Sequence, residues 1–445
     1  MSEAFDIDAE QRRLEATVKQ ALTLAEKFGA TACEVDASAS QGLEVSVRMG
    51  NVDTMSQSRD QQIQVTVYRG QRKGSASTMD TGEVALHATV EKACEIARFT
   101  GEDAASGLAD AALMAQDRPE LAVYYPWSIT PDEAMALATR CEAAGLDHPD
   151  VVNSEGATVS TARNVHVYGN SHGFIGSQQR SSHSLSCVLI AKRGDEMQRD
   201  YEYSSVRDPA QLTDAETIGR RAAEKAVARL GGTRPHTGQY PIVFAPNMAR
   251  TLVSHLLGAI AGGALYRDAS FLCGALGQPL FPQWFSLVEK PREKGGLASA
   301  VFDAEGVYTR ENQFIRQGVL SSYLLSSYSA RRLDTITTGN AGGARNLRIQ
   351  APLTSYTELL AGIDKGILVT ELMGQGVNTV TGDYSRGAAG FWIENGKRAH
   401  PIENFTLAGS LRDMFAGLDA VGDDIDTRGN LHTGSWRIGK MTVAS

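Results

Sequence analysis

The chain has 445 residues, of which 42% are hydrophobic and 21% charged, a composition typical of globular proteins and unlike that of disordered chains. Because single hydrophobic cores seldom grow beyond about 250–300 residues, the length predicts two domains. The net charge of −9 argues against general attraction to phosphate backbones, so nucleic acid is not an expected partner.

In the first half of the chain, hydrophobic periodicity predicts helices and antiparallel strands in alternation. A helix is predicted over residues 9–28, followed by two strands around residues 43–47 and 63–67 that a turn at Gly50-Asn51 separates. Further helices are predicted over residues 82–97, 131–144 and 215–230, and further strands around residues 165–170 and 185–189.

The predicted domain boundary is the segment of residues 231–238, which is rich in glycine and holds a proline. It gives an N-terminal domain of residues 1–232 and a β-rich C-terminal domain of residues 233–445. The predicted fold class is therefore α+β, with two domains that each contain a mainly antiparallel sheet and packed helices.

In the second half, Asn247 is expected to cap an apolar helix that starts after a short strand over residues 241–244. The apolar stretch from Thr251 to Tyr266 is shorter than the roughly 20 residues of a membrane span, so a core helix is expected and a membrane is not. Strands are predicted over residues 318–325 and 366–372, and a hairpin turn at Asn395-Gly396.

The five cysteines are scattered without a C-x-x-C pair, which predicts reduced thiols rather than a disulfide framework. Residues 1–11 are polar and acidic and lack the apolar core of a secretory signal. Both observations predict a cytoplasmic location.

One short motif could carry a nucleophile. Asn170, Ser171 and His172 lie within a G-x-S-x-G pattern, which in serine hydrolases occupies a sharp turn from a strand into a helix. Here the residues after the motif are typical of a second strand, so a hairpin tip is the alternative interpretation. The sequence leaves both a hydrolase using Ser171 and a structural turn open.

The apolar helix around His255 is the candidate for a metal site, but it lacks most of the ligands that such a site needs. A catalytic zinc ion needs two or three ligands on a rigid element, usually with a nearby glutamate as base. His255 is the single histidine of the apolar helix, and no glutamate lies between Thr251 and Leu265. One histidine cannot hold the metal, so His255 is expected to be a core or cleft residue.

Glycine-rich segments are the remaining candidates for a binding site. Gly374 and Gly376 flank a short strand together with the segment that holds Asp383 and Arg386. Closely spaced glycines allow one backbone to approach another. Asp383 and Arg386 are expected either to pair with each other or to meet the termini of a substrate. The glycine-rich loop over residues 339–343 is expected to be flexible or to bind a peptide or carboxylate through its amides.

Together these segments resemble the TldD/TldE peptidase family, and within it the TldE (PmbA) branch. The resemblance covers the chain from about residue 10 to its end. The segments that carry it are residues 72–77 (RKGSAS), 168–173 (YGNSHG), 258–263 (GAIAGG), 326–331 (SSYSAR), 369–376 (VTELMGQG) and, most specifically, 381–392 (TGDYSRGAAGFW). Gly262 and Gly263 become substrate-cleft candidates through this resemblance, alongside His255, Gly374, Gly376, Asp383 and Arg386.

The resemblance implies a cytoplasmic metalloprotease built from two related chains. The TldD-like chain carries zinc on an H-E-x-x-x-H helix and a further cysteine ligand near its C-terminus. In this sequence Ser254 and Ala259 replace the two histidines, His255 stands in the position of the glutamate, and Thr433 in that of the cysteine. No metal ligand is carried over, so no cofactor is expected in this chain and zinc is expected in the partner.

The sequence therefore predicts a metal-free protease subunit whose partners are a TldD-like chain and a polypeptide substrate. The family's substrates are small or unfolded polypeptides, including peptide-antibiotic precursors, and DNA gyrase is linked to it indirectly. A homodimer of the isolated chain is left open. The alternative is a non-catalytic peptide-binding or regulatory module.

Overall fold

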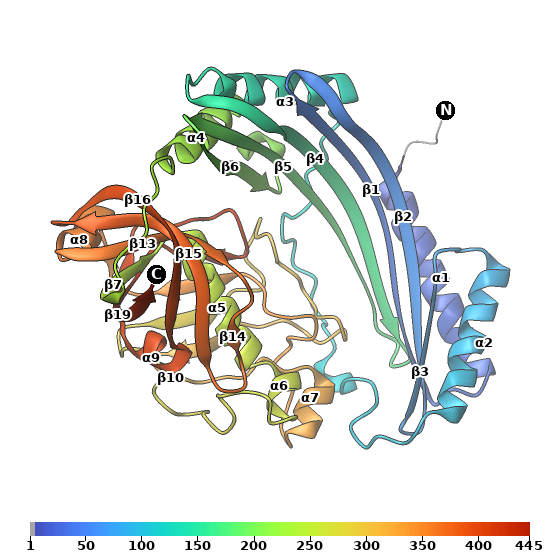
Figure 1. The fold of residues 1–445 in the computed structure, drawn as a ribbon. Coiled ribbons are helices and arrows are strands. Elements are labelled where there is room, and N and C mark those ends of the chain that lie inside the picture. Colours follow the sequence, from blue (N-terminus) through green and yellow to red (C-terminus); the bar gives the residue numbers. More distant parts are fainter. Residues whose placement is uncertain (1–4) are drawn as a thin grey trace.

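The structure is a computed structural model, and it describes residues 5–445. Within that range the strands form three sheets, one in the first half of the chain and two in the second. The sheets are mainly antiparallel and the helices pack against them, which confirms the predicted α+β class (Figure 1). The division at residues 232 and 233 stays a prediction.

The first sheet has six antiparallel strands within residues 5–445, in the order β3-β2-β1-β4-β5-β6. Long hairpins build it, and the predicted turn at Gly50 closes one of them, with a positive φ of 74° that glycine tolerates. The strands are β1 (Ala32–Arg48), β2 (Asn51–Arg69), β3 (Arg72–Thr78), β4 (Val151–Asn170), β5 (Ile175–Arg193) and β6 (Glu196–Val206).

Four helices cover one face of this sheet, which curves so that its other face looks toward the second half of the chain (Figure 1). Two of them pack on one end of the sheet and two on the other. They are α1 (Ile7–Lys27), α2 (Glu83–Phe99), α3 (Pro131–Leu146) and α4 (Ala215–Ala228). The crossing of α3 and α4 requires glycine, because a Cβ on Gly219 would lie 1.9 Å from the carbonyl oxygen of Cys141.

The second half contains a sheet that closes on itself. β19 pairs with both β16 and β7, so that the ring β7-β13-β15-β16-β19 returns to its start. The ring strands are β7 (Gly238–Phe244), β13 (Lys365–Met373), β15 (Asp383–Glu394), β16 (Lys397–Ser410) and β19 (Trp436–Ala444), and β12 (Leu353–Thr354), β14 (Val377–Asn378) and β17 (Leu418–Gly422) extend it.

A third sheet has the order β10-β9-β8-β11-β18. Its strands are β8 (Ser286–Glu289), β9 (Asn312–Arg316), β10 (Val319–Leu320), β11 (Leu347–Gln350) and β18 (Leu431–His432). The strand predicted over residues 318–325 is wrong in its length, because regular pairing ends at Leu320 and only a single bridge at Leu324 follows.

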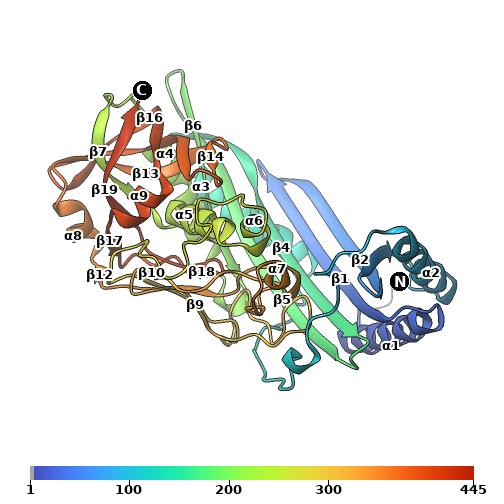
Figure 2. The same cartoon turned by 90° about the horizontal axis from the view of Figure 1, so that it is seen from below.

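The apolar helix of the second half ends earlier than its hydrophobicity predicts. It is α5 (Pro246–Ala259), and the chain then turns into the separate short helix α6 (Gly262–Leu265). The other helices are α7 (Ser327–Arg332), α8 (Tyr356–Ala361) and α9 (Leu411–Ala416), and two short 3-10 turns are η1 (Ala111–Leu113) and η2 (Pro209–Gln211). Figure 2 shows α5 between the closed sheet and the loops of the third sheet.

The buried side of α5 belongs to the largest hydrophobic core. Leu252, Val253 and Leu256 are fully buried there with Ile242 and Phe244 of β7. No helix within residues 5–445 is both long and apolar enough to cross a bilayer.

Candidate functional site

The start of α5 differs from the predicted one. Pro246 occupies the first helical position, where its missing N–H costs nothing, and Ala245 precedes it. Asn247 therefore lies inside the first turn and does not cap the helix. Its side-chain oxygen accepts a hydrogen bond from the backbone N–H of Met248 at 3.1 Å.

His255 lies half-buried on α5 against β15. Its ring stands edge-on to that of Tyr384, with centroids 6.2 Å apart. Neither the buried Nε2 of His255 nor the buried hydroxyl of Tyr384 has a hydrogen-bond partner. Burial, followed by the nearby charge of Arg386, lowers the pKa of His255, so the imidazole is neutral at pH 7.

At the positions where the resemblance implies zinc ligands, the side chains present do not fit a zinc ion. Ser254 donates its hydroxyl to the carbonyl oxygen of Arg250 at 3.0 Å, and Ala259 has no donor atom. Thr433 is buried, and its hydroxyl accepts a hydrogen bond from Nε1 of Trp436 at 2.8 Å. In the described part of the chain no group of three His, Cys, Asp or Glu side chains is placed to hold a metal ion.

The loop between β13 and β15 brings Gly374 and Gly376 close to β15. A Cβ on Gly376 would lie 1.9 Å from the carbonyl oxygen of Ser385, so only glycine allows this approach of the two backbones. The carbonyl of Gly376 in turn accepts a hydrogen bond from the N–H of Ser385 at 2.6 Å. Gly374 is exposed and adopts a φ of 78°.

The expected pairing of Asp383 with Arg386 is wrong. Side chains three residues apart on a regular strand point to opposite faces, and β15 is regular over this segment. Asp383 instead accepts a hydrogen bond from the hydroxyl of Thr381 at 2.6 Å. Arg386 makes a long contact of 3.4 Å from Nε to the carbonyl oxygen of Met373.

Gly262 and Gly263 lie at the far end of α5, where they serve packing. The N–H of Gly262 donates to the carbonyl of Leu324 at 2.9 Å, and a Cβ on Gly262 would lie 2.3 Å from the hydroxyl of Ser329. Gly263 is half-buried beside it. The N–H of Phe271 donates to the carbonyl of Thr379 at 3.0 Å, and a Cβ on Gly382 would lie 3.1 Å from the ring of Phe271, so this end of the helix region joins the β14–β15 turn.

Ser171 lies at the tip of the β4–β5 hairpin and not on a strand-to-helix turn. Its hydroxyl accepts a hydrogen bond from the N–H of Cys33 at 3.0 Å. His172 contacts the carbonyl oxygen of Ala109 through Nε2 at 3.1 Å, and Asn170 is buried. Because a second strand follows, the geometry that exposes a hydrolase nucleophile is missing.

The glycine-rich loop of residues 339–343 binds a carboxylate that belongs to the chain itself. The N–H of Ala341 donates to Oδ2 of Asp303 at 3.0 Å, and Oδ1 of Asp303 accepts the N–H groups of Glu305 and Val307. Burial, reinforced by the charge of Glu305, raises the pKa of Asp303 to about 6.

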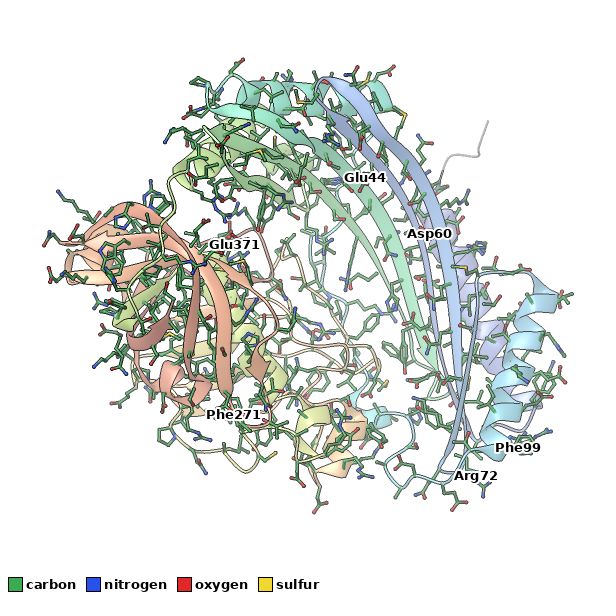
Figure 3. All side chains as sticks on the ribbon, in the orientation of Figure 1. Glu44, Asp60, Arg72, Phe99, Phe271 and Glu371 are labelled. Atoms are coloured by element: carbon green, nitrogen blue, oxygen red, sulfur yellow. The ribbon has the colours of Figure 1, made fainter. Side chains whose placement is uncertain are left out.

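A cavity of about 1050 Å³ lies where the first sheet meets the second half of the chain. One wall is formed by β6 and α4 and the other by β13, the start of α5 and the segment of residues 424–428. Tyr201 and Tyr203, with stacked rings 6.2 Å apart, lie on the first wall. Figure 3 shows Glu371 on the side of the second half that faces the first sheet.

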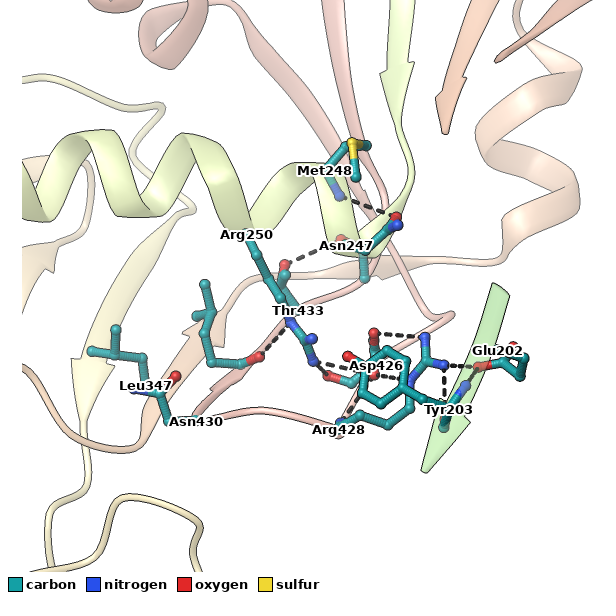
Figure 4. A network of polar contacts seen from close by, with 12 residues as sticks. Glu202, Tyr203, Asn247, Met248, Arg250, Leu347, Asp426, Arg428, Asn430 and Thr433 are labelled. Atoms are coloured by element: carbon teal, nitrogen blue, oxygen red, sulfur yellow. Dashed lines mark hydrogen bonds and ion pairs between the residues drawn. The ribbon is translucent and has the colours of Figure 1, made fainter. Parts of the chain in front are cut away.

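Charged side chains join the two walls (Figure 4). Arg428 donates to both carboxylate oxygens of Asp426, at 2.9 and 3.0 Å, and also pairs with Glu202 of β6. Arg250 of α5 contacts Asp426 at 3.1 Å, and Lys225 of α4 contacts Glu202 at 2.8 Å. Burial acts to raise the pKa of Asp426, but the hydrogen bonds from Arg428 and the charges of Arg250 and Arg428 together outweigh it and lower that pKa.

The structure therefore brings some of the candidate residues from the sequence together and places the others elsewhere. His255 and Arg386 lie close together where α5 meets β15, and Gly374 and Gly376 lie on the loop beside β15. Asn170, Ser171 and His172 lie elsewhere, on the hairpin tip. The sequence analysis did not predict the cavity or its charged network. The one local signal for them was the segment of residues 423–426, which is rich in aspartate.

A curved antiparallel sheet carrying helices on one face, joined to a closed sheet that packs against α5, defines the class of this protein as a two-part α+β fold. Three segments of the chain match the sequence patterns of PmbA/TldA metallopeptidases. They are domain 1 over residues 33–97, the central domain over residues 124–230 and the C-terminal domain over residues 237–445. The chain therefore belongs to the PmbA/TldD family of metallopeptidases.

Named relatives are similar over almost the whole chain. Metalloprotease PmbA of Escherichia coli O157:H7 is 42% identical over 439 residues, covering 98% of this chain and 97% of the relative. The PmbA homologue of Haemophilus influenzae is 42% identical over 440 residues, with the same 98% and 97% coverage.

Solved structures share the fold. A Bacteroides thetaiotaomicron protein described as a modulator of DNA gyrase superposes with a TM-score of 0.92 at 26% identity, over 97% of this chain and 98% of that one. TldE from Thermococcus kodakarensis has a TM-score of 0.81 at 20% identity, over 96% and 100%, and shows the fold alone.

Proposed function

We propose that this chain is the metal-free subunit of a TldD/TldE-type cytoplasmic metalloprotease that degrades or processes small or unfolded polypeptides. A TldD-like partner chain supplies the zinc ion, the activated water and the general base. Zinc, when bound in that partner, polarises the scissile carbonyl and lowers the pKa of its bound water. The residues of this chain bind and orient the substrate.

The proposal rests on α5, whose side chains offer too few atoms that could coordinate a metal ion. The sequence resemblance implies that α5 corresponds to the family's zinc helix. On this helix Ser254 bonds to its own backbone, Ala259 has no donor, and His255 is neutral with its Nε2 buried. A single imidazole without a carboxylate neighbour cannot hold a catalytic zinc ion. The metalloprotease names of the relatives support a role in proteolysis, and the sequence resemblance to the TldE branch is the reason to expect a TldD-like partner.

The substrate-binding part of the proposal rests on the loop at Gly374 and Gly376. Within the described residues β14 pairs with β15 alone, and we place an extended polypeptide beside its two-residue outer edge, where the N–H of Val377 now donates to the carbonyl of Gln375 at 2.8 Å. The exposed Asp383 and the half-buried Arg386 stand beside this edge on opposite faces of β15, where they can meet groups of the substrate.

The test is elemental analysis and a cleavage assay on the purified chain. We expect no stoichiometric zinc and no cleavage of a fluorescently labelled unfolded polypeptide by the chain alone, and cleavage after a TldD-like chain is added. A variant with Ser254→His, His255→Glu, Ala259→His and Thr433→Cys is the positive control for zinc binding. Tight zinc in the unmodified chain overturns the proposal.

The cavity between the first sheet and the second half of the chain favours a second function, that of a non-catalytic peptide-binding or regulatory module. Its lining mixes tyrosines with both signs of charge, a combination that suits a peptide segment. Fluorescence anisotropy of a labelled unfolded peptide distinguishes the two functions. Binding to the isolated chain, with the peptide left intact after the TldD-like chain is added, supports the module and not the protease subunit.

A further inference from the structure

Three arginine side chains gather where the first sheet meets the loops of the second half. Arg180 lies on β5, Arg207 directly follows β6, and Arg345 lies in the loop before β11. The odd-numbered Leu185 of β5 packs in the core formed with α3 and α4. The even-numbered Arg180 therefore points to the opposite face of the sheet, which looks toward the second half (Figure 1).

Hydrogen bonds to neighbouring backbone place Arg207 beside Arg180. The guanidinium of Arg207 donates to the carbonyl oxygen of Ser181, the residue that follows Arg180 on β5. It also donates to the carbonyl oxygen of Leu297 in the second half. Arg207 therefore connects the end of β5 that carries Arg180 to a loop of the other half.

Arg345 reaches the same part of the sheet from the second half. Its Nη2 contacts the carbonyl oxygen of Phe302 at 3.4 Å, and the ring of Phe302 stacks on that of His166 of β4, with centroids 6.4 Å apart. His166 lies directly opposite Gln178 of β5. Gln178 precedes Arg180 by two residues and shares its face of the strand, so the charge of Arg345 acts on Arg180.

Carboxylates do not balance the positive charge of this group. In the described residues no carboxylate raises the pKa of Arg180 or of Arg207, whereas Asp303 and Glu289 both act on Arg345. Burial, followed by the charges of Arg207 and Arg345, lowers the pKa of Arg180 to about 10. Arg180 still carries its proton at pH 7, so three cations repel one another in a region where little water screens them.

Arg180 also keeps N–H donors that no protein acceptor uses. Its one hydrogen bond within residues 5–445 runs from Nη2 to Oε1 of Gln178 at 2.6 Å. Its Nε is buried without an acceptor, as is Nε of Arg207. Its Nη1 also lacks an acceptor but is not buried. Ser182, the next residue on the same face of β5, is exposed, so solvent reaches this part of the sheet.

A structural role accounts for two of the three arginines. Arg207 ties Ser181 to Leu297, and Arg345 holds the glycine-rich loop through the carbonyl oxygens of Gly339 and Gly343. Arg180 holds no other part of the chain, because its one acceptor is a neighbour on its own strand. The position of a third cation beside two others is thus left without a structural reason.

We propose that Arg180, supported by the positive charge of Arg207 and Arg345, binds an oxyanion, namely the carboxylate or phosphate group of a ligand. A guanidinium presents its donors in a plane that matches the oxygens of both groups. The anion accepts from the free Nη1 of Arg180 and offsets the repulsion among the three cations. The site belongs to this chain alone and does not rest on the proposed function.

The test is calorimetric titration of the purified chain with inorganic phosphate and with acetate, at an ionic strength held constant with sodium chloride. We expect saturable binding at one site per chain, with phosphate bound more tightly because its charge is larger. Arg180→Gln should weaken phosphate binding at least about tenfold. Arg180→Lys keeps the charge but loses the planar set of donors, so it should weaken binding less than Arg180→Gln.

The control is Arg163→Gln on β4. Arg163 is also half-buried on the first sheet, but its Nε and Nη2 both donate to Oε1 of Gln41, at 3.0 and 2.5 Å. This variant should bind phosphate within about twofold of the unmodified chain. Thermal unfolding without phosphate shows that each variant is folded, and added phosphate should raise the melting temperature of Arg163→Gln but not that of Arg180→Gln.

Competition distinguishes the two sources of the oxyanion. A short peptide with uncharged side chains and a free C-terminal carboxylate is compared with the same peptide amidated at its C-terminus. Displacement of phosphate by the free acid alone supports the site and assigns it to the carboxylate of a polypeptide. Displacement by neither peptide, with phosphate still bound through Arg180, supports the site and assigns it to a phosphate group.

The proposal is overturned if the unmodified chain shows no saturable binding of phosphate or acetate. It is also overturned if folded Arg180→Gln and Arg180→Lys chains both bind phosphate as tightly as the unmodified chain. Equal weakening by Arg180→Gln and Arg163→Gln would show a general effect of net charge and would likewise overturn it.

Discussion

Arg428 and Glu202 form an ion pair across the junction between the two halves of the chain. Glu202 comes from β6 and is only 6% exposed, while Arg428 lies in the segment that follows β17. Arg428 also holds Asp426 and covers the ring of Tyr203 at 4.5 Å. One guanidinium therefore pairs with two buried carboxylates that lie far apart in the sequence.

We expect Arg428→Met to destabilise the protein by about 2 kcal/mol, because it leaves Glu202 and Asp426 with one fewer cation each. Lys225 and Arg250 remain and reduce the loss. The free energy of unfolding in urea measures it. The control is Arg199→Ala, which breaks an exposed pair with Glu155 and should cost less than about 1 kcal/mol. Equal losses in both variants would contradict the prediction.

The pKa of Asp303, raised to about 6 by burial, gives a stability that depends on pH. A carboxyl whose folded-state pKa exceeds its unfolded value of about 3.9 contributes stability at low pH, and that contribution is lost as the pH rises through about 6. In the unmodified chain this group makes the free energy of unfolding fall as the pH rises from about 4 to 7. We expect Asp303→Asn to reduce that fall, and the same dependence on pH in both proteins would refute the prediction.

Asp426 provides the opposite case, since burial is outweighed by the hydrogen bonds from Arg428 and the charges of Arg250 and Arg428 together, which hold its pKa below the usual value. Its contribution to stability is present above about pH 4 and is lost as the pH falls toward the lowered folded-state pKa. In Asp426→Asn we expect a smaller loss of stability on acidification below about pH 4, measured by the same unfolding experiment. A variant that loses stability as steeply as the unmodified chain would show that Asp426 does not titrate in this way.

Gly376 is expected to be intolerant of a side chain. Gly376→Ala places a Cβ against the carbonyl of Ser385 and should cost about 2 kcal/mol or more, while weakening cleavage by the two-chain assembly. Gly258→Ala is the matched control, because nothing lies within 4 Å of that Cβ on α5. There we expect a gain of about 0.5–1 kcal/mol from helix propensity.

The unpartnered hydroxyl of Tyr384 leads to a prediction of increased stability. Removing a buried polar group that has no hydrogen bond relieves its desolvation cost, so Tyr384→Phe should stabilise the protein by up to about 1 kcal/mol. Thermal unfolding measures the effect. A clear loss of stability would reveal a hydrogen-bonded water between Tyr384 and His255.

Labelling with a fluorophosphonate tests Ser171. We expect no labelling, because the hydroxyl of Ser171 is bonded to the N–H of Cys33 on a hairpin tip. Ser171→Ala should cost about 1 kcal/mol by leaving that N–H without its partner. Labelling that Ser171→Ala removes would restore the hydrolase interpretation.

Local patterns in the sequence predicted the four long helices of the first half and turns in both halves of the chain. The helix that contains Leu14 and Val18, the turn at Gly50 and the hairpin turn at Asn395-Gly396 were all predicted, because periodicity and turn chemistry act over a few residues. Asn247 was misplaced because Pro246, one residue earlier, is itself a strong signal for the first helical position. The length of α5 was also wrong, since continued hydrophobicity does not indicate where a helix ends.

The sequence by itself determined the family, the α+β class and the lack of metal donors at Ser254 and Ala259, because each of these is a matter of residue type and near neighbours. Only the tertiary structure decided that Asp383 and Arg386 point apart, that Arg207 lies near Arg180, and that Arg428 meets Glu202. Arg428 and Glu202 are separated by 226 residues, and such contacts depend on how whole sheets pack. That packing is a collective property of the core, and no local pattern encodes it.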